Sequence, residues 1–190
     1  MTLPYLAFVV FFSNLCESFL ITFQSDKPLI HLLFHGMSTL LTTILQSIVN
    51  KKCLYVNDEG VAKKLKPIAD LVMIDLHKKE NLKSAKLIEI GTKARSLIQD
   101  SLLLDSDIAT FRSSCRICYV EAASYLQVNL PFNNKVLEYA QFLHPQKRND
   151  RLSLNSIANL ALKITNVFGP KSYQAFNVSS DKSPADILIW

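Results

Sequence analysis

Two long apolar segments, separated by a short polar corner, dominate the first 50 residues of this 190-residue chain. Residues 3–23 contain one charged side chain, Glu17, and residues 28–50 contain none. Each segment is close to the length that crosses a bilayer as a helix, about 20 residues. The chain is therefore either a helical protein with a large apolar core or a small membrane protein with two spans, at 3–23 and 28–50.

The positions of the polar residues in these segments favour the helical protein. In the first segment, Ser13, Asn14, Glu17 and Ser18 fall on one narrow face of a helix. In the second, a stripe of Ser, Thr and Gln lies opposite apolar residues at helical spacing, which are Met37, Leu40, Leu41, Ile44, Leu45, Ile48 and Val49. A basic region before the apolar run and a small-residue cleavage site, the marks of a signal peptide, are not seen. We therefore expect no membrane association, and a nuclear or cytoplasmic location.

Composition points to a mainly α fold. Hydrophobic residues make up 49% and charged residues 19% of the chain, which is typical of a globular protein. Only 4 residues are glycine, too few for a protein built from many tight β-turns. We predict a helical bundle of about six or seven helices, with short extended segments near 68–76 and 86–90.

Two later helices carry clear signals. Asp105-Ser106-Asp107 predicts a helix start, and the helix after it has an apolar stripe formed by Ile108, Phe111, Cys115, Cys118, Ala122 and Tyr125. A last helix is predicted before Gly169-Pro170. The expected organisation is a helical domain over 1–150, an additional packed helix over 151–170, and a polar, poorly ordered tail over 171–190.

No residue pattern predicts catalysis or metal binding. Cys115 and Cys118 form a CxxC pair, but zinc needs four ligands and no second pair lies nearby, so we expect both in the core. His31 and His35 could share one ligand on a helix, but Leu32 stands where a zinc protease has Glu. Phosphate-binding glycine loops, nucleophile elbows and kinase motifs are also missing. We therefore predict no catalytic, cofactor-binding or metal residues, and no enzyme.

The net charge of +5 is unevenly distributed. Most of the basic excess lies in the region 51–95, where lysines alternate with acidic residues. A dense patch with aromatic or arginine partners would be typical of nucleic-acid recognition. A solvated surface is the simpler interpretation, and weak contact with a DNA backbone through 51–95 is an open alternative.

Several short motifs follow one another in a distinctive order. The polar corner Phe23–Ile30 lies between the two apolar segments, and the later motifs are Ile74-Asp75-Leu76, Asn81-Leu82, Ile88-Glu89-Ile90-Gly91, Phe111-Arg112 with Cys115, Leu130-Pro131-Phe132 and Leu143-His144-Pro145. This order resembles that of hAT-type DNA transposase-like proteins, which are common in animals as domesticated or decaying genes. The resemblance covers roughly residues 5–150 with gaps. One departure is His31-Leu32-Leu33, where Pro-Phe-Leu is common in the family.

The resemblance implies a particular part of such a protein. In that family a large helical insertion interrupts an RNase H-like nuclease core whose acidic residues hold divalent metal. This chain resembles the insertion, so the first two catalytic acids would lie upstream of Met1 and the third beyond Trp190, or be missing. The implied function is a transposase-derived fragment without its own catalysis, acting as a protein-interaction module for an unknown protein partner. A DNA-backbone-binding accessory domain, or the two-span membrane protein, is the alternative.

Overall fold

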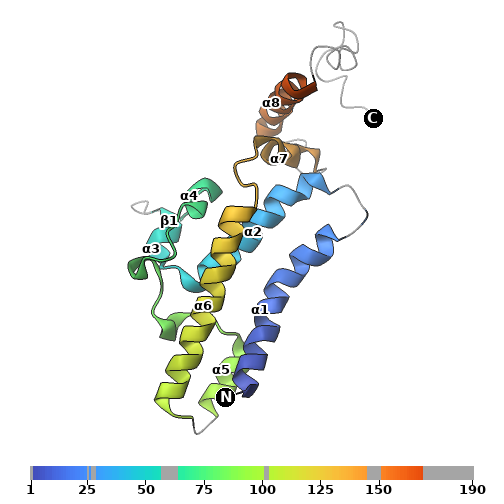
Figure 1. The fold of residues 1–190 in the computed structure, drawn as a ribbon. Coiled ribbons are helices and arrows are strands. Elements are labelled where there is room, and N and C mark those ends of the chain that lie inside the picture. Colours follow the sequence, from blue (N-terminus) through green and yellow to red (C-terminus); the bar gives the residue numbers. More distant parts are fainter. Residues whose placement is uncertain are drawn as a thin grey trace, which may run out of the picture. The chain divides into compact units, whose positions relative to one another are not determined.

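The computed structural model describes residues 2–24, 26, 29–56, 64–100, 103–144 and 151–168. These ranges contain eight α-helices, three 3-10 helices and one two-stranded antiparallel sheet (Figure 1). The prediction of a mainly α fold is confirmed. The predicted tail over 171–190 lies outside the described residues.

The chain divides into two compact units, Met1–Asn134 and Lys135–Trp190, so the boundary comes before the predicted one at residue 150. The first unit contains α1 (Thr2–Phe23), α2 (Ile30–Ile48), α3 (Lys51–Leu54), β1 (Tyr55–Val56), β2 (Lys64–Leu65), α4 (Ile68–Val72), η1 (Lys79–Asn81), η2 (Ala85–Leu87), α5 (Thr92–Gln99) and α6 (Asp105–Asn129). The second contains α7 (Lys135–Ala140), η3 (Gln141–Leu143) and α8 (Arg151–Phe168).

Helix α2 supplies the centre of the first unit's core. Its predicted apolar face is confirmed, because every member is at most 7% exposed: Met37, Leu40, Leu41, Ile44, Leu45, Ile48 and Val49. The opposite polar face is half-buried or exposed, apart from Ser47, which is 8% exposed. The Ser47 hydroxyl donates to the carbonyl of Thr43 at 3.0 Å, so its burial leaves no unmet donor.

Helix α6 packs along α2, but with a different face from the one predicted. Its buried residues are spaced by four and are Phe111, Cys115, Tyr119 and Ala123. The predicted stripe is confirmed at Phe111 and Cys115 and wrong at Cys118 and Tyr125, which are exposed. Residues at every fourth position form a row that winds slowly around the helix. Such rows are the ridges that pack into the grooves of a crossing helix.

Helix α1 lies against α6 through an aromatic face. Tyr5 and Phe111 meet edge to face, with ring centroids 4.9 Å apart. Tyr119 receives both Phe8, at 5.6 Å, and Phe12, at 5.2 Å, in similar T-shaped contacts. Edge-to-face pairs of this kind stabilise beyond their buried area, by roughly 0.5–1.5 kcal/mol each. The inner face of α1 is therefore an integral part of the core.

The start of α5 also depends on α1. Gly91 has a φ of 81°, in the left-handed region that favours glycine, and a Cβ there would lie 2.7 Å from Cγ of Phe11. The Glu89 carboxylate accepts a hydrogen bond from the Gly91 amide at 3.0 Å and ion-pairs with Arg95 at 2.9 Å. These contacts close the first turn of α5 against the ring of Phe11.

The segment before α5 is mostly turns, and the prediction of an extended stretch over 68–76 is wrong at Ile68–Val72, which form α4. Pro67 precedes this helix with φ −54°, a conformation suited to a helix start. In the second predicted stretch, 86–90, the η2 turn ends at Leu87 and extended backbone begins at Ile88. Apolar runs without alternation fit a strand or a short helix equally well, which explains the wrong assignment.

Two side-chain amides hold these turns to the helices. The Asn50 amide donates to the carbonyls of Glu80 at 2.9 Å and Leu82 at 2.8 Å. The Gln127 amide of α6 donates to the carbonyls of Leu71 at 3.2 Å and Ile74 at 3.1 Å. Irregular backbone packed against helices needs such partners for its polar groups.

In the second unit, α7 and α8 pack against each other. Leu137 and Ala140 of α7 are buried, as is Leu160 of α8. Lys135 and Glu138 form an exposed ion pair at 2.6 Å on α7. The predicted helix over 151–170 corresponds to α8, which ends at Phe168.

Candidate functional site

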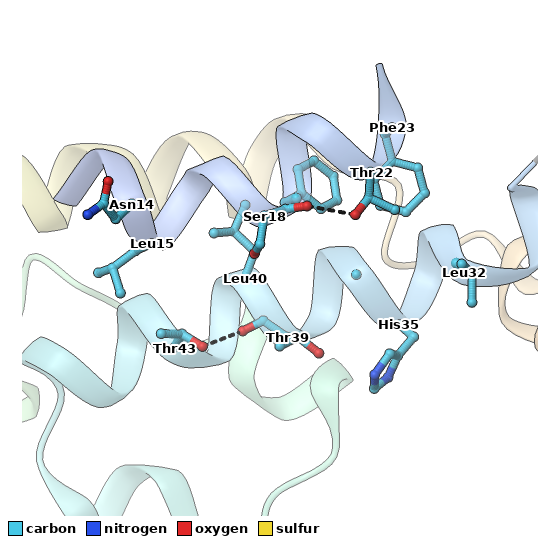
Figure 2. A pocket seen from close by; sticks show the side chains of 12 residues that line it. Asn14, Leu15, Ser18, Thr22, Phe23, Leu32, His35, Thr39, Leu40 and Thr43 are labelled. Atoms are coloured by element: carbon cyan, nitrogen blue, oxygen red, sulfur yellow. Dashed lines mark hydrogen bonds between the residues drawn. The ribbon is translucent and has the colours of Figure 1, made fainter. Parts of the chain in front are cut away.

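A groove of about 450 Å³ lies between α1 and α2 (Figure 2). The two helices run antiparallel, so Asn14, Ser18 and Thr22 from α1 face residues of α2 such as Thr39 and Thr43. Gly36 permits the close approach of the helices, because Cε2 of Phe23 lies 2.7 Å from the position a Cβ would take.

Two hydroxyl groups of this groove are hydrogen-bonded to carbonyls of their own helices. Thr22 donates to the Ser18 carbonyl at 2.7 Å and Thr43 to the Thr39 carbonyl at 2.9 Å (Figure 2). His35 is the one titratable residue in the lining, and no carboxylate or thiol lines the groove with it. A nucleophile activated by a base would need a second group within hydrogen-bond reach. This groove therefore has the character of a helix–helix seam and not of a catalytic site.

The outer face of α1 is the most unusual surface of the first unit. Although α1 is strongly apolar, only Pro4 and Phe8 of its 22 residues are buried. The exposed apolar residues, each between 49% and 64% exposed, are Leu3, Leu6, Val9, Val10, Leu20 and Ile21. The predicted polar face, Ser13 to Ser18, lies in the middle of this surface and is also exposed where predicted. We call Leu3, Leu6, Val9 and Val10 the outer apolar patch.

Helix α1 is also long and apolar enough to cross a membrane, with a mean hydropathy of 1.8 over its most apolar stretch and 6% of that stretch buried. It is the one helix among the described residues with this property, and α2 does not share it. Core helices of globular proteins and N-terminal signal sequences have the same length and composition.

The CxxC pair is divided between two environments. Cys115 is buried, whereas Cys118 is exposed, so the expectation of core packing is right for the first and wrong for the second. In the described part of the chain, no three His, Cys, Asp or Glu side chains come close enough to hold a metal ion. His31 is half-buried and His35 exposed on α2.

Burial suppresses the ionisation of two core groups on α6. It raises the pKa of the Cys115 thiol to about 12, with a further contribution from Cys118. It also raises the pKa of Tyr119 to about 12, against a smaller lowering effect of the nearby Ser47 hydroxyl. The Tyr119 hydroxyl has no hydrogen-bond partner among the described residues, so its proximity to the Ser47 hydroxyl does not amount to a hydrogen bond. Both groups are therefore neutral parts of the core at ordinary pH.

Basic residues of the region 51–95 are mostly on the surface, as expected for solvated lysines. Lys51, Lys52, Lys78 and Lys79 are exposed. Lys83 is half-buried, and its ammonium donates to the carbonyl of Gln46. Burial lowers the pKa of Lys83, and the nearby charge of Lys51 lowers it further.

A second hollow, of about 330 Å³, is lined by cationic side chains from three elements. Lys86 comes from η2, Arg95 from α5 and Arg112 from α6. Sequence reasoning missed this grouping, because Arg112 and Lys86 are far apart in the chain. The spacing of Phe111 and Cys115 predicted the apolar face of this helix. That spacing gave no indication that Arg112 would line a hollow.

Two of the short sequence motifs, at 74–76 and 81–82, have structural roles. The Asp75 side chain accepts from the amide of His77 at 2.9 Å, and Asn81 donates to the Asp75 carbonyl at 2.8 Å. Leu82 pairs with Val49 in an isolated β-bridge.

Comparison of the chain with protein-family models, with curated proteins and with solved structures found no match.

Proposed function

We propose that this protein is a protein-interaction module without catalysis of its own, and that the outer apolar patch of α1 binds a helix of a partner protein. The observation that carries the proposal is the two-sided character of α1. Its aromatic face is packed on α6, while Leu3, Leu6, Val9 and Val10 are 64%, 56%, 55% and 60% exposed. Contiguous exposed apolar surface of this kind is typical of interaction sites.

The spacing of the patch suits a helical partner. Leu3, Leu6 and Val10 are separated by three and four residues, so they form one line along the helix. Amphipathic helices recognise each other through such lines of apolar residues. Beyond the patch, Ser13, Asn14, Glu17 and Ser18 are exposed and polar, which limits the apolar contact to the first three turns of α1.

The motif order that resembles hAT-type transposase-like proteins supports the same proposal. In that resemblance the chain corresponds to a helical insertion, and such a segment has no catalytic acids of its own. The transposase-derived origin and a nuclear or cytoplasmic location are parts of this proposal. An inner face built into a bundle, with an outer face available for contact, is what an interaction module requires.

Site-specific photo-crosslinking tests the proposal. A benzophenone amino acid at Val10 in the full chain, expressed in cells, should yield a discrete protein adduct, because the side chain lies in the patch. The same group at Glu121, exposed on α6, is the matched control and should not yield that adduct. Leu6→Glu should abolish the adduct while the helical circular dichroism signal is retained. Adducts of equal yield at both positions would contradict the proposal.

Membrane attachment through α1 is the second candidate function, and the length and mean hydropathy of this helix favour it. Fractionation distinguishes the two. A membrane span pellets with membranes and resists carbonate extraction, whereas an interaction module remains in the soluble fraction with its partner. Lipid adducts at Val10 in place of protein adducts would favour the membrane.

A further inference from the structure

We propose that the hollow between η2, α5 and α6 binds the phosphate group of a small ligand. This inference is independent of the function proposed for α1. The hollow has a volume of about 330 Å³ and is lined by Lys86, Leu87, Ile88, Arg95, Ile98, Gln99 and Arg112. Three of its seven lining residues are cationic and none is acidic. We call it the basic pocket.

Arg112 is held in place for this role. Its Nη1 donates to the backbone carbonyl of Lys86 at 2.9 Å, which fixes the guanidinium between α6 and η2. A guanidinium has five N–H donors, so this bond leaves the others available. No carboxylate in the described part of the chain forms an ion pair with Arg112. A planar, fixed and uncompensated guanidinium is well suited to a phosphate.

The other two cations add to this charge. Arg95 uses Nη2 for both oxygens of Glu89, at 2.9 and 3.1 Å, which orients its guanidinium but offsets its charge. The same carboxylate accepts from the Gly91 amide, so Glu89 is occupied and does not line the basic pocket. Lys86 is exposed, and its ammonium has no ion-pair partner among the described residues. The pocket is therefore positive overall.

The walls indicate a small ligand with an apolar body. Leu87 is 71% exposed at the edge of the pocket, whereas Ile88 and Ile98 are 3% and 7% exposed beneath it. An exposed leucine beside a cationic cluster offers a surface for the ring of a phosphate ester such as a nucleotide. The cations are confined to one concave site, whereas a nucleic-acid backbone is bound along an extended basic face.

Titration of the full-length ¹⁵N-labelled protein, followed by NMR at constant ionic strength, tests the inference. The probes are inorganic pyrophosphate and adenosine 5′-monophosphate. The sodium chloride concentration is lowered as each probe is added, so that the ionic strength stays constant. The amide shifts should saturate and be confined to residues 86–88, 95–99 and 112. Lys86→Gln should weaken pyrophosphate binding by about fivefold or more, and Arg112→Gln by about tenfold.

Arg116→Gln is the matched control, because Arg116 lies one turn further along α6 and does not line the basic pocket. The affinity of the Arg116→Gln variant for pyrophosphate should stay within about twofold of that of the unchanged protein. Lys86→Gln removes no structural hydrogen bond of the side chain, so it tests the site even if Arg112→Gln impairs folding. Shifts that do not saturate, or that spread over the exposed lysines, would overturn the proposal. Duplex DNA binding that depends equally on Arg116 and Arg112, without binding of adenosine 5′-monophosphate, would also overturn it.

Discussion

Replacing Gly91 by alanine should destabilise the first unit through two separable effects. With φ 81° and ψ 153°, Gly91 has a backbone conformation that essentially only glycine adopts, and forcing an L-residue into it costs roughly 1–3 kcal/mol. The new Cβ would also lie 2.7 Å from Cγ and 2.9 Å from Cβ of Phe11, closer than carbon atoms pack. Overpacking of this kind costs roughly 1–3 kcal/mol. We expect the free energy of unfolding to fall by about 2–5 kcal/mol, because the lower conformational entropy of the unfolded alanine variant offsets a small part of the two costs.

A double-mutant cycle separates the steric effect from the backbone strain. Phe11→Ala removes the ring atoms that Gly91→Ala would meet but keeps Cβ, 2.9 Å from the new methyl group, so the cost of Gly91→Ala in that background should fall by about 1 kcal/mol or more without disappearing. The backbone strain should persist in both backgrounds. Urea unfolding followed by circular dichroism at 222 nm measures all four proteins.

Gly36→Ala is the matched control for this cycle. Its Cβ would meet the tip of the Phe23 ring at 2.7 Å and Cδ2 of Phe19 at 3.3 Å, and both contacts are with side chains and not with backbone. Alanine also gains roughly 1 kcal/mol over glycine inside a helix. The net change should therefore be within about 1 kcal/mol. An equal cost of Gly91→Ala with and without the Phe11 ring would refute the packing of α1 against α5, and with it the aromatic face on which the function proposal depends.

Three further predictions concern the core and its support. Tyr119→Phe should raise the free energy of unfolding by roughly 1 kcal/mol in urea, because it removes a buried hydroxyl without a partner; a loss of stability would show that the Ser47 contact is a true bond. The pKa values of Cys115 and Tyr119, raised to about 12 by burial, favour the neutral folded forms, so stability should be full below pH 9 and decline from pH 9 towards 12. That decline should be shallower in Cys115→Ala, measured by thermal melting against pH. Gln127→Leu should destabilise by roughly 1–3 kcal/mol and raise amide exchange near Leu71, since two backbone carbonyls lose their donor.

The face of α2 was predictable because its signal is local. An uncharged run with apolar residues at three and four residue steps has one way to bury its apolar side. The buried face of α6 was only half predictable. After Cys115, either Cys118, three residues on, or Tyr119, four residues on, could be the next buried residue, and the outcome depends on the angle at which α6 crosses its partner. That angle is set by side chains of α1 and α2, which no local pattern in α6 contains.

The basic pocket and the exposed side of α1 belong to a different class of feature. Arg112 reaches the carbonyl of Lys86 only after the turns at 82–91 have brought η2 beside α6. Lys86 belongs to the basic region 51–95 and Arg112 to the helix predicted after Asp105, but their meeting depends on tertiary structure. The exposure of Leu6 and Val10 likewise follows from the choice of the aromatic side of α1 as its inner face.

The pairing of α1 with α6 has a consequence for the order in which the protein folds. The Tyr5 hydroxyl donates to the Ser114 hydroxyl across 109 positions of sequence, so the aromatic side of α1 lacks its partner on α6 until most of the first unit has been synthesised. At about 5–20 residues per second, the ribosome takes roughly 5–20 s to cover that distance. During that time the eleven-residue stretch from Leu3 to Ser13, rich in Phe and Val, is a nascent chain with both sides open to chaperones and targeting factors.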